Sequence, residues 1–323
     1  MDINLIEAAD RRLEGHVRRT PLLSSPFLDE IAGRRVLVKP ECLQHTGSFK
    51  FRGGWAAITA LDPEQRARGV LATSSGNHAQ GIAKAAAAHG VRAVIVMPSD
   101  APEIKIANTR ALGAEVVLYD RATEDRDLLA ADRIEADGLS FIPPFDHPQV
   151  IAGQGSVGLE IAAQAQEEGV TEGDVLVCCG GGGLTSGIAL ALEARAPGLR
   201  PRTVEPEGFD DFARSLDEGR ICRNPATSGS ICDAILTPEP GRLTFPVVSR
   251  LAGPGLVVSE DECLRAMALA FARLRIVLEP GGAAALAAAL FRPEEIAGEA
   301  VIAVATGGNV DPAVFRQALD RHG

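Results

Sequence analysis

Lysine is scarce in this sequence of 323 residues, since its 32 basic residues include only four lysines, Lys39, Lys50, Lys84 and Lys105. Arginine keeps its proton in a protein and cannot act as an amine nucleophile, whereas lysine can. Lys50 follows the small and turn-forming residues Thr46, Gly47 and Ser48 instead of lying on a polar helix face. This setting is typical of a lysine held in place for covalent chemistry, and also of a surface lysine after a turn.

Other absences exclude whole classes of protein. No run reaches about 18 apolar residues, the length of a transmembrane helix, and the first ten residues carry acids where a signal peptide carries basic residues. The net charge of −11 argues against a nucleic acid partner, because phosphate binding needs a basic surface. The six cysteines show no C-x-x-C spacing, so we expect buried free thiols. We therefore expect a cytoplasmic protein with neither a membrane nor a nucleic acid as partner.

Apolar runs typical of strands alternate with helical patterns along most of the sequence. Strands are expected at residues 35–39, 69–73, 91–97, 115–118, 140–142, 174–179, 202–205 and 300–305. Residues 220–256 are rich in glycine, proline and polar residues, which predicts a long irregular connection. The alternation predicts an α/β fold with parallel sheets covered by helices on both faces. Ligands of such sheets bind beyond the carboxyl ends of the strands.

Four consecutive glycines, Gly180–Gly183, stand between an apolar strand and a helical pattern. Glycines let backbone N–H groups turn inward and the start of the next helix favours an anion, so this run predicts a phosphate site. Two common nucleotide motifs do not fit, because G-x-G-x-x-G would need a glycine at Thr185 and a P-loop from Gly182 would need a lysine at Ile188. A purely structural tight turn is the other interpretation.

Polar residues follow three further strands. The hydroxyl, amide and N–H groups of residues 74–78 suit a carboxylate or a ring substituent, although such residues also simply cap helices. Thr306, in the turn 306–309, offers a hydroxyl group to a cleft, or merely belongs to a turn. Carboxylates cluster over residues 205–211, where they would suit Mg²⁺ or Ca²⁺ or form a solvated acidic loop.

A lysine nucleophile, a phosphate cradle and polar turns at successive strand ends together indicate pyridoxal phosphate held covalently by Lys50. The sequence also resembles the fold type II pyridoxal-phosphate enzymes, in particular the serine/threonine dehydratase and serine racemase family. The resemblance spans most of the chain and is carried by residues 46–53, 75–81, 151–155, 180–183 and 279–282. It implies a fold like that of the tryptophan synthase β-subunit, with two domains of parallel-rich sheets flanked by helices.

The resemblance implies that the cofactor is bound by Phe49, Lys50, Asn77, Gly180, Gly181, Gly182, Gly183, Leu184, Glu279 and Thr306. Phe49 would pack beside the ring, and Asn77 would hydrogen-bond its 3-hydroxyl group. The glycines and Leu184 would bind the phosphate through backbone N–H groups. Thr306 would face the pyridine nitrogen, where family members commonly have serine.

The resemblance also implies catalytic and substrate-binding residues. Lys50 would remove the Cα proton of the substrate, after which the β-hydroxyl group would leave. Ser74 and His78 would help to bind the substrate carboxylate, and Arg133 would meet a second one. Ser75 leaves racemisation open, because many dehydratases of this kind have alanine there whereas serine racemases use a serine as an acid and base.

The family pattern predicts further features of the whole molecule. Glu205, the Phe209 carbonyl and Asp211 match the spacing of a divalent-cation site, for Mg²⁺ or for Ca²⁺ or Mn²⁺. A small domain at residues 48–146 would be inserted into a large domain formed by residues 1–47 and 147–323, with the active site between them. We also expect a homodimer. Since the sequence stops soon after Asp311, we expect no C-terminal regulatory domain and no feedback by isoleucine.

Three functions fit these expectations. The first is a dehydratase, or ammonia-lyase, that converts L-threonine, L-serine or a 3-hydroxy relative to the 2-oxo acid and ammonia. The second is a serine or aspartate racemase, or a dehydratase specific for 3-hydroxyaspartate. The third is a pyridoxal-phosphate-binding protein without catalytic activity.

Overall fold

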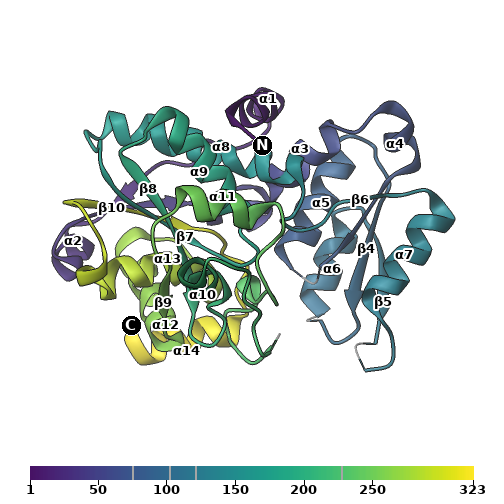
Figure 1. Ribbon diagram of the computed structural model, residues 1–323. Helices are drawn as coiled ribbons and strands as arrows, with labels where there is room; N and C mark the ends of the chain where they lie inside the picture. The colour runs from purple at the N-terminus through teal and green to yellow at the C-terminus, as the bar shows by residue number, and fades with distance from the viewer. Residues whose placement is uncertain (75, 102, 121, 227) are drawn as a thin grey trace.

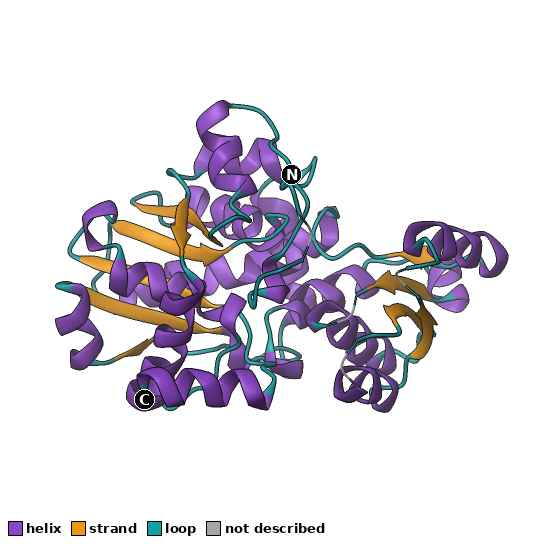
Figure 2. Ribbon diagram, turned by 90° about the horizontal axis from the view of Figure 1, so that it is seen from below, coloured by secondary structure: helices purple, strands orange, loops and turns teal. Residues whose placement is uncertain are grey.

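The computed structural model describes residues 1–74, 76–101, 103–120, 122–226 and 228–323, and it contains two separate β-sheets with helices on both faces (Figures 1 and 2). The strands are β1 (Leu23–Ser24), β2 (Arg35–Pro40), β3 (Val70–Thr73), β4 (Ala93–Pro98), β5 (Glu115–Tyr119), β6 (Ser140–Phe141), β7 (Gly173–Cys178), β8 (Leu199–Pro206), β9 (Leu256–Val258) and β10 (Ala300–Ala305). The larger sheet has the order β1-β2-β10-β7-β8-β9 and the smaller one β5-β4-β3-β6.

The helices lie between these strands in the chain. The first group is α1 (Ile3–Leu13), α2 (Pro26–Ala32), α3 (Lys50–Thr59), α4 (Pro63–Arg68), α5 (Asn77–Ala88), α6 (Glu103–Ala111) and α7 (Arg126–Asp137). The second group is α8 (Pro148–Glu167), α9 (Gly183–Arg195), α10 (Asp211–Glu218), α11 (Thr244–Leu251), α12 (Glu260–Leu269), α13 (Pro280–Phe291) and α14 (Pro312–His322). No helix in the described part of the chain combines the length and hydropathy needed to cross a membrane.

The pairing of the strands confirms the predicted parallel-rich α/β fold. Strand β1 runs antiparallel to β2, whereas the remaining neighbours in both sheets pair in parallel. Parallel strands are buried on both faces, which is why they appear in the sequence as continuous apolar runs. Their carboxyl ends therefore meet at one edge of each sheet.

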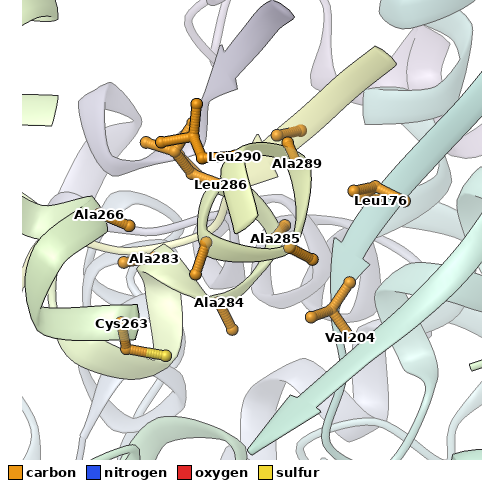
Figure 3. Packing of buried hydrophobic residues seen from close by; sticks show 14 of the residues in the cluster. Leu176, Val204, Cys263, Ala266, Ala283, Ala284, Ala285, Leu286, Ala289 and Leu290 are labelled. Carbon is orange, nitrogen blue, oxygen red and sulfur yellow. The ribbon is translucent and has the colours of Figure 1, made fainter. Parts of the chain in front are cut away.

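Successive side chains along the strands of the larger sheet point to opposite faces, and a layer of helices packs on each face. Leu176 and Val204 point towards α13, a helix rich in alanine that packs closely on the sheet (Figure 3). Val175 and Val177, on the opposite face of β7, pack against α8 and α9. The helix α13 is buried from Pro280 to Leu290, and its small side chains let its backbone approach the strands. This packing fixes the strand ends from which the site is built.

The predicted irregular connection at residues 220–256 is wrong in its second half, which contains helix α11 and the start of β9. Pro246 made this segment look non-helical in the sequence, because proline usually interrupts helices. It is the third residue of α11, where the N–H group that proline lacks would have no partner within the helix. The predicted free thiols are confirmed, since all six cysteines are unpaired and only Cys42 is partly exposed.

Candidate active site

A cavity of about 770 Å³ lies where the carboxyl ends of strands from both sheets come together. Strand ends of the smaller sheet contribute Thr73 and Tyr119, and those of the larger sheet contribute Cys178 and Thr306. The structure brings most of the predicted site residues to this cavity. They are Phe49, Lys50, Ser74, Asn77, His78, Gly180, Gly181, Gly182, Gly183, Leu184, Glu279 and Thr306.

Lys50 is the first residue of α3 and lines this cavity, where its backbone neighbours anchor it. Ser48 forms a bridge with Gly307, and the Phe49 N–H group donates to the Thr306 carbonyl at 3.2 Å. The Lys50 Nζ donates to the Pro144 carbonyl at 2.8 Å. Burial lowers the pKa of Lys50 to about 8, against an opposing effect of Glu279. A neutral amine is therefore accessible near neutral pH, as nucleophilic chemistry requires.

The glycine run forms the turn between β7 and α9, and larger residues do not fit there. Gly182 has a φ of +84°, and a Cβ on it would lie 2.4 Å from the Phe212 ring. A Cβ on Gly181 would lie 2.3 Å from the Phe145 ring. Among the described residues, the N–H groups of residues 181–184 find no acceptor. These free donors at a helix start fit a phosphate group.

The Asn77 side chain is oriented by two neighbours at the start of α5. Its Nδ2 donates to Glu279 Oε1 at 2.6 Å, and its Oδ1 accepts from Asn309 Nδ2 at 2.7 Å. Glu279 is 3% exposed, and burial raises its pKa to about 7. One N–H bond of the Asn77 amide remains for a ligand in the cavity, which fits the predicted contact with a ring oxygen.

His78 lies in the cavity as a neutral ring. Burial, followed by the charge of Lys50, lowers its pKa to about 3. Its Nε2 lies 2.8 Å from the Ile142 carbonyl, which can only accept, so Nε2 carries the proton and Nδ1 is an acceptor. The ring thus offers no charge to a carboxylate. The backbone N–H groups of Asn77 and His78, which have no acceptor among the described residues, are the better donors.

One predicted residue is not brought to the site. Arg133 does not line the cavity, because its guanidinium group pairs with Glu115 at 2.5 Å on the smaller sheet's side of α7. Arg126, two helical turns earlier on α7, lines it instead. Ser75, the residue on which the racemase alternative rests, lies outside the described residues.

Two of the predicted cation ligands, Glu205 and Asp211, lie close to each other, beside Phe212, which contacts the glycine loop of residues 180–183. Glu205, at the end of β8, accepts hydrogen bonds from the N–H groups of Phe212 and Ala213, both at 2.8 Å. Asp211 Oδ1 accepts from Asn224 at 2.6 Å, and its Oδ2 is buried without a partner among the described residues. Burial raises the pKa of Asp211 to about 7 and that of Glu205 well above its usual value. No group of three or more acids, histidines or cysteines that could hold a metal ion occurs in the described part.

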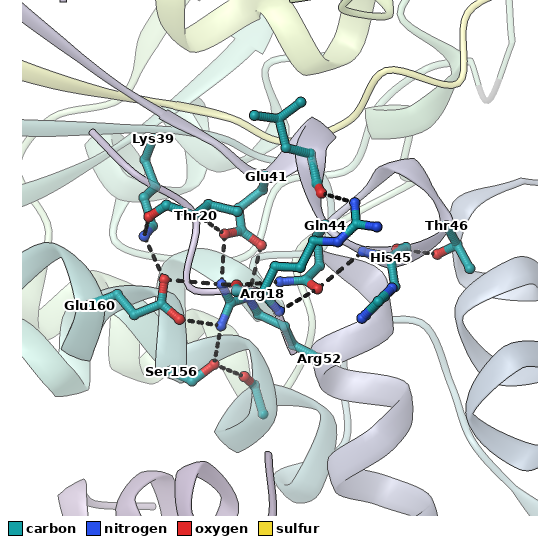
Figure 4. A network of polar contacts seen from close by, with 12 residues as sticks. Arg18, Thr20, Lys39, Glu41, Gln44, His45, Thr46, Arg52, Ser156 and Glu160 are labelled. Atoms are coloured by element: carbon teal, nitrogen blue, oxygen red, sulfur yellow. Dashed lines mark hydrogen bonds and ion pairs between the residues drawn. The ribbon is translucent and has the colours of Figure 1, made fainter. Parts of the chain in front are cut away.

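A buried ionic network, which the sequence does not suggest, anchors the helix that carries Lys50 (Figure 4). Arg52 donates to both carboxylate oxygens of Glu41 at 2.8 Å and to Glu160 at 2.7 Å. Glu160 also accepts from Lys39 at 2.5 Å. Arg52, Glu41 and Lys39 are fully buried and the Glu160 side chain is 13% exposed, so two positive and two negative charges balance with little access to water. The network ties α3 to β2 and α8.

Comparisons with known proteins agree with the geometry of the cavity. A family model described as pyridoxal-phosphate dependent enzyme matches residues 13–307. The chain is 44% identical to an L-threo-3-hydroxyaspartate ammonia-lyase of Pseudomonas sp over 98% of this chain and 97% of the relative. It is 39% identical to a serine racemase of Schizosaccharomyces pombe over 95% and 93% of the two chains. The solved structure of a threonine deaminase from T.th. superposes with a TM-score of 0.90 at 44% identity, covering 96% and 99%.

Proposed function

The chain belongs to the pyridoxal-phosphate-dependent enzymes, and on that premise we propose that it is an ammonia-lyase acting on a 3-hydroxyamino acid. In the overall reaction the substrate loses its β-hydroxyl and amino groups and yields a 2-oxo acid and ammonium. The observation that carries this proposal is Lys50, an amine of pKa about 8 in the same cavity as the glycine loop. A relative with this activity and 44% identity supports it.

The residues present fit the cofactor. The free N–H groups of residues 181–184 would hold its phosphate, Asn77 its ring oxygen, and Thr306 its pyridine nitrogen. When bound, the cofactor supplies a ring that withdraws electrons from the substrate Cα. Lys50 would hold the cofactor covalently until the substrate amine takes its place, and the released, neutral Lys50 amine would then accept the Cα proton. The Phe49 ring lines the cavity beside this amine, with its centroid 5.1 Å from Lys50 Nζ.

We propose 3-hydroxyaspartate as the first substrate to test. The substrate α-carboxylate would lie at the start of α5, on the N–H groups of Asn77 and His78. The wall of the cavity includes the basic side chains of Lys105 and Arg126, which pair with acidic residues at 3.1 and 2.8 Å. A second substrate carboxylate would take the place of these acidic partners. Serine and threonine lack this group, so they would not use these basic residues.

The experiment is a screen for 2-oxo acid release from L-serine, L-threonine and the stereoisomers of 3-hydroxyaspartate, with Lys50→Ala as the blank. Release from any of these by the wild type, absent in the blank, supports a lyase. Arg126→Ala should weaken activity on hydroxyaspartate more than on serine. Formation of D-serine that disappears in Ser75→Ala would favour a racemase. A cofactor-bound protein that releases no 2-oxo acid and forms no D-isomer would favour a non-catalytic role.

We also propose that Glu205, Asp211 and the Phe209 carbonyl bind a divalent cation, most simply Mg²⁺. The support is the pair of buried carboxylates, one with an oxygen that has no partner among the described residues. Burial raises the pKa of both carboxyl groups, and a cation would neutralise the charge of their ionised forms, since hard cations favour oxygen ligands. The cation would supply charge balance beside the start of α10, which Glu205 also holds.

Several expectations on the whole molecule remain proposals. The small domain at residues 48–146 is supported by the smaller sheet, all of which lies within residues 70–141. A homodimer would cover exposed apolar side chains such as Phe27, Ile31 and Phe271, and sedimentation would test it. The cytoplasmic location also stays a prediction.

A further inference from the structure

Gln154 is a buried side chain whose polar atoms have no partner. It lies in the middle of α8, is 1% exposed and lines the active-site cavity. Among the described residues, neither its Oε1 nor its Nε2 takes part in a hydrogen bond. Buried amides are almost always hydrogen-bonded, and an orphan amide is costly to bury. The exception therefore indicates a partner that comes from outside the chain.

The position of this amide indicates which partner it meets. A Cβ on Gly183 would lie 2.8 Å from Gln154 Oε1, and a Cβ on Gly53 would lie 3.1 Å from its Nε2. The amide thus fills the space between the helix that begins at Lys50 and the helix that begins at the glycine loop. A half-turn of the amide exchanges its nitrogen and oxygen, and no existing hydrogen bond opposes this turn.

The amide lies beside Gly183, in a segment whose unsatisfied N–H groups are donors and therefore suit an anion. The N–H groups of residues 181–184 have no acceptor among the described residues, and they lie at the positive end of α9. An anion bound there would accept from these N–H groups and from Gln154 Nε2 together. We propose that Gln154 donates a hydrogen bond to the phosphate group of the cofactor and so completes the glycine cradle. This inference rests on the proposed use of the cavity as the cofactor site.

The proposal is tested on the cofactor-free protein with Gln154→Met, because methionine has a similar unbranched shape and no polar atom to satisfy. The matched control is Gln164→Met, ten residues later on α8. Gln164 is also buried but bonded, accepting from Lys39 at 2.9 Å and donating to the Thr20 carbonyl at 2.8 Å. Two quantities are measured for each variant, the unfolding temperature without cofactor and the dissociation constant of pyridoxal phosphate.

The two variants should behave in opposite ways. Gln154→Met should leave the unfolding temperature unchanged or raise it. It should also weaken the binding of pyridoxal phosphate about tenfold or more, which is the usual effect of losing a hydrogen bond to a charged group. Gln164→Met should lower the unfolding temperature and keep the affinity. Pyridoxal, which lacks the phosphate, should bind wild type and Gln154→Met equally.

Three outcomes would overturn the inference. They are a lower unfolding temperature with unchanged affinity in Gln154→Met, an equal loss of affinity for pyridoxal and pyridoxal phosphate, and no change in either quantity. None of these readouts depends on turnover. Failure of the wild type to bind pyridoxal phosphate would instead remove the cofactor site itself, and a wild type that binds it without releasing a 2-oxo acid would remove only the proposed reaction.

Discussion

Asn77 Nδ2 donates a hydrogen bond of 2.6 Å to Glu279 Oε1, which joins the start of α5 to the start of α13 beside Lys50. The two residues are 202 positions apart, and each belongs to a different sheet's set of helices. The contact holds the Asn77 amide in one orientation, with its oxygen turned to Asn309 at 2.7 Å. It also places in the cavity a carboxyl group whose pKa of about 7 leaves it only partly ionised at neutral pH.

Glu279 makes the stability of the cofactor-free protein depend on pH. Its pKa of about 7 lies above the ordinary value of 4.5, mainly because of burial, with Asp233 and Lys50 among the charges around it. The folded state thus binds more protons between these values, so the contribution of Glu279 to stability falls as the pH rises from about 4.5 to 7. Glu279→Gln cannot ionise. It should raise the free energy of unfolding at pH 7.5, by on the order of 3 kcal/mol at most, and change it little at pH 5.

Urea unfolding at these two pH values measures the effect, with the exposed Glu294→Gln as the control. If Glu279→Gln raised the free energy of unfolding equally at both pH values, the result would contradict the raised pKa of Glu279.

The lowered pKa of Lys50 should be visible in the rate at which the cofactor attaches to the cofactor-free protein. Only the neutral amine attacks the aldehyde group, so the rate should rise with pH and level off above about 8. For an exposed lysine, the rate would continue to rise up to about pH 10.4. The appearance of cofactor absorbance on mixing measures this rate. Because Glu279 raises the pKa of Lys50, Glu279→Gln should move the midpoint to lower pH, and a midpoint near 10 would contradict the account.

Arg52 should be critical for folding because its partner Glu41 has no access to water. Arg52→Met would leave Glu41 charged and buried, at a cost of about 3–5 kcal/mol in the free energy of unfolding. The control is Arg35→Met, which removes an ion pair with Glu168 in which the Arg35 side chain is 41% exposed, and which should cost less than about 1 kcal/mol. Equal losses in urea unfolding would show that the buried network contributes no more than a surface pair.

Divalent cations should stabilise the protein through Asp211. Millimolar Mg²⁺ or Mn²⁺ should raise the unfolding temperature of the wild type, because a cation relieves the repulsion between the buried Glu205 and Asp211. Asp211→Asn should remove this shift, whereas Asp217→Asn, on the exposed side of α10, should keep it. A wild type that does not respond, or an equal shift in Asp211→Asn, would exclude the cation site.

The parallel strands could be predicted from the sequence because burial on both faces leaves a continuous apolar run. Residues 174–179 and 300–305 were expected as strands, and β7 and β10 occupy Gly173–Cys178 and Ala300–Ala305. The glycine run was informative for a similar reason, since only glycine tolerates the contacts seen at residues 181 and 182. Such local requirements restrict which residue types can occur at a position, so they can be recognised in the sequence.

Features that depend on packing between segments far apart in the sequence could not be recognised in this way. Arg126 and Arg133 lie seven residues apart on α7, about two turns, so they share a helix face, and only the tertiary structure decides which end reaches the cavity. Gln154 belongs to the segment 151–155, which is part of the family pattern, yet its missing partners become visible only when α3, α8 and α9 pack together. The network of Arg52 combines four charges spread over residues 39–160.

The proposed covalent bond between Lys50 and the cofactor can be tested directly, because the chain contains only four lysines. The cofactor-loaded protein is reduced with borohydride, which fixes the cofactor to its lysine, then digested and analysed by mass spectrometry. We expect the added mass on the peptide that contains Lys50 and on none of the peptides that contain Lys39, Lys84 or Lys105. A label on another lysine, or cofactor-loaded protein with no labelled peptide, would contradict it.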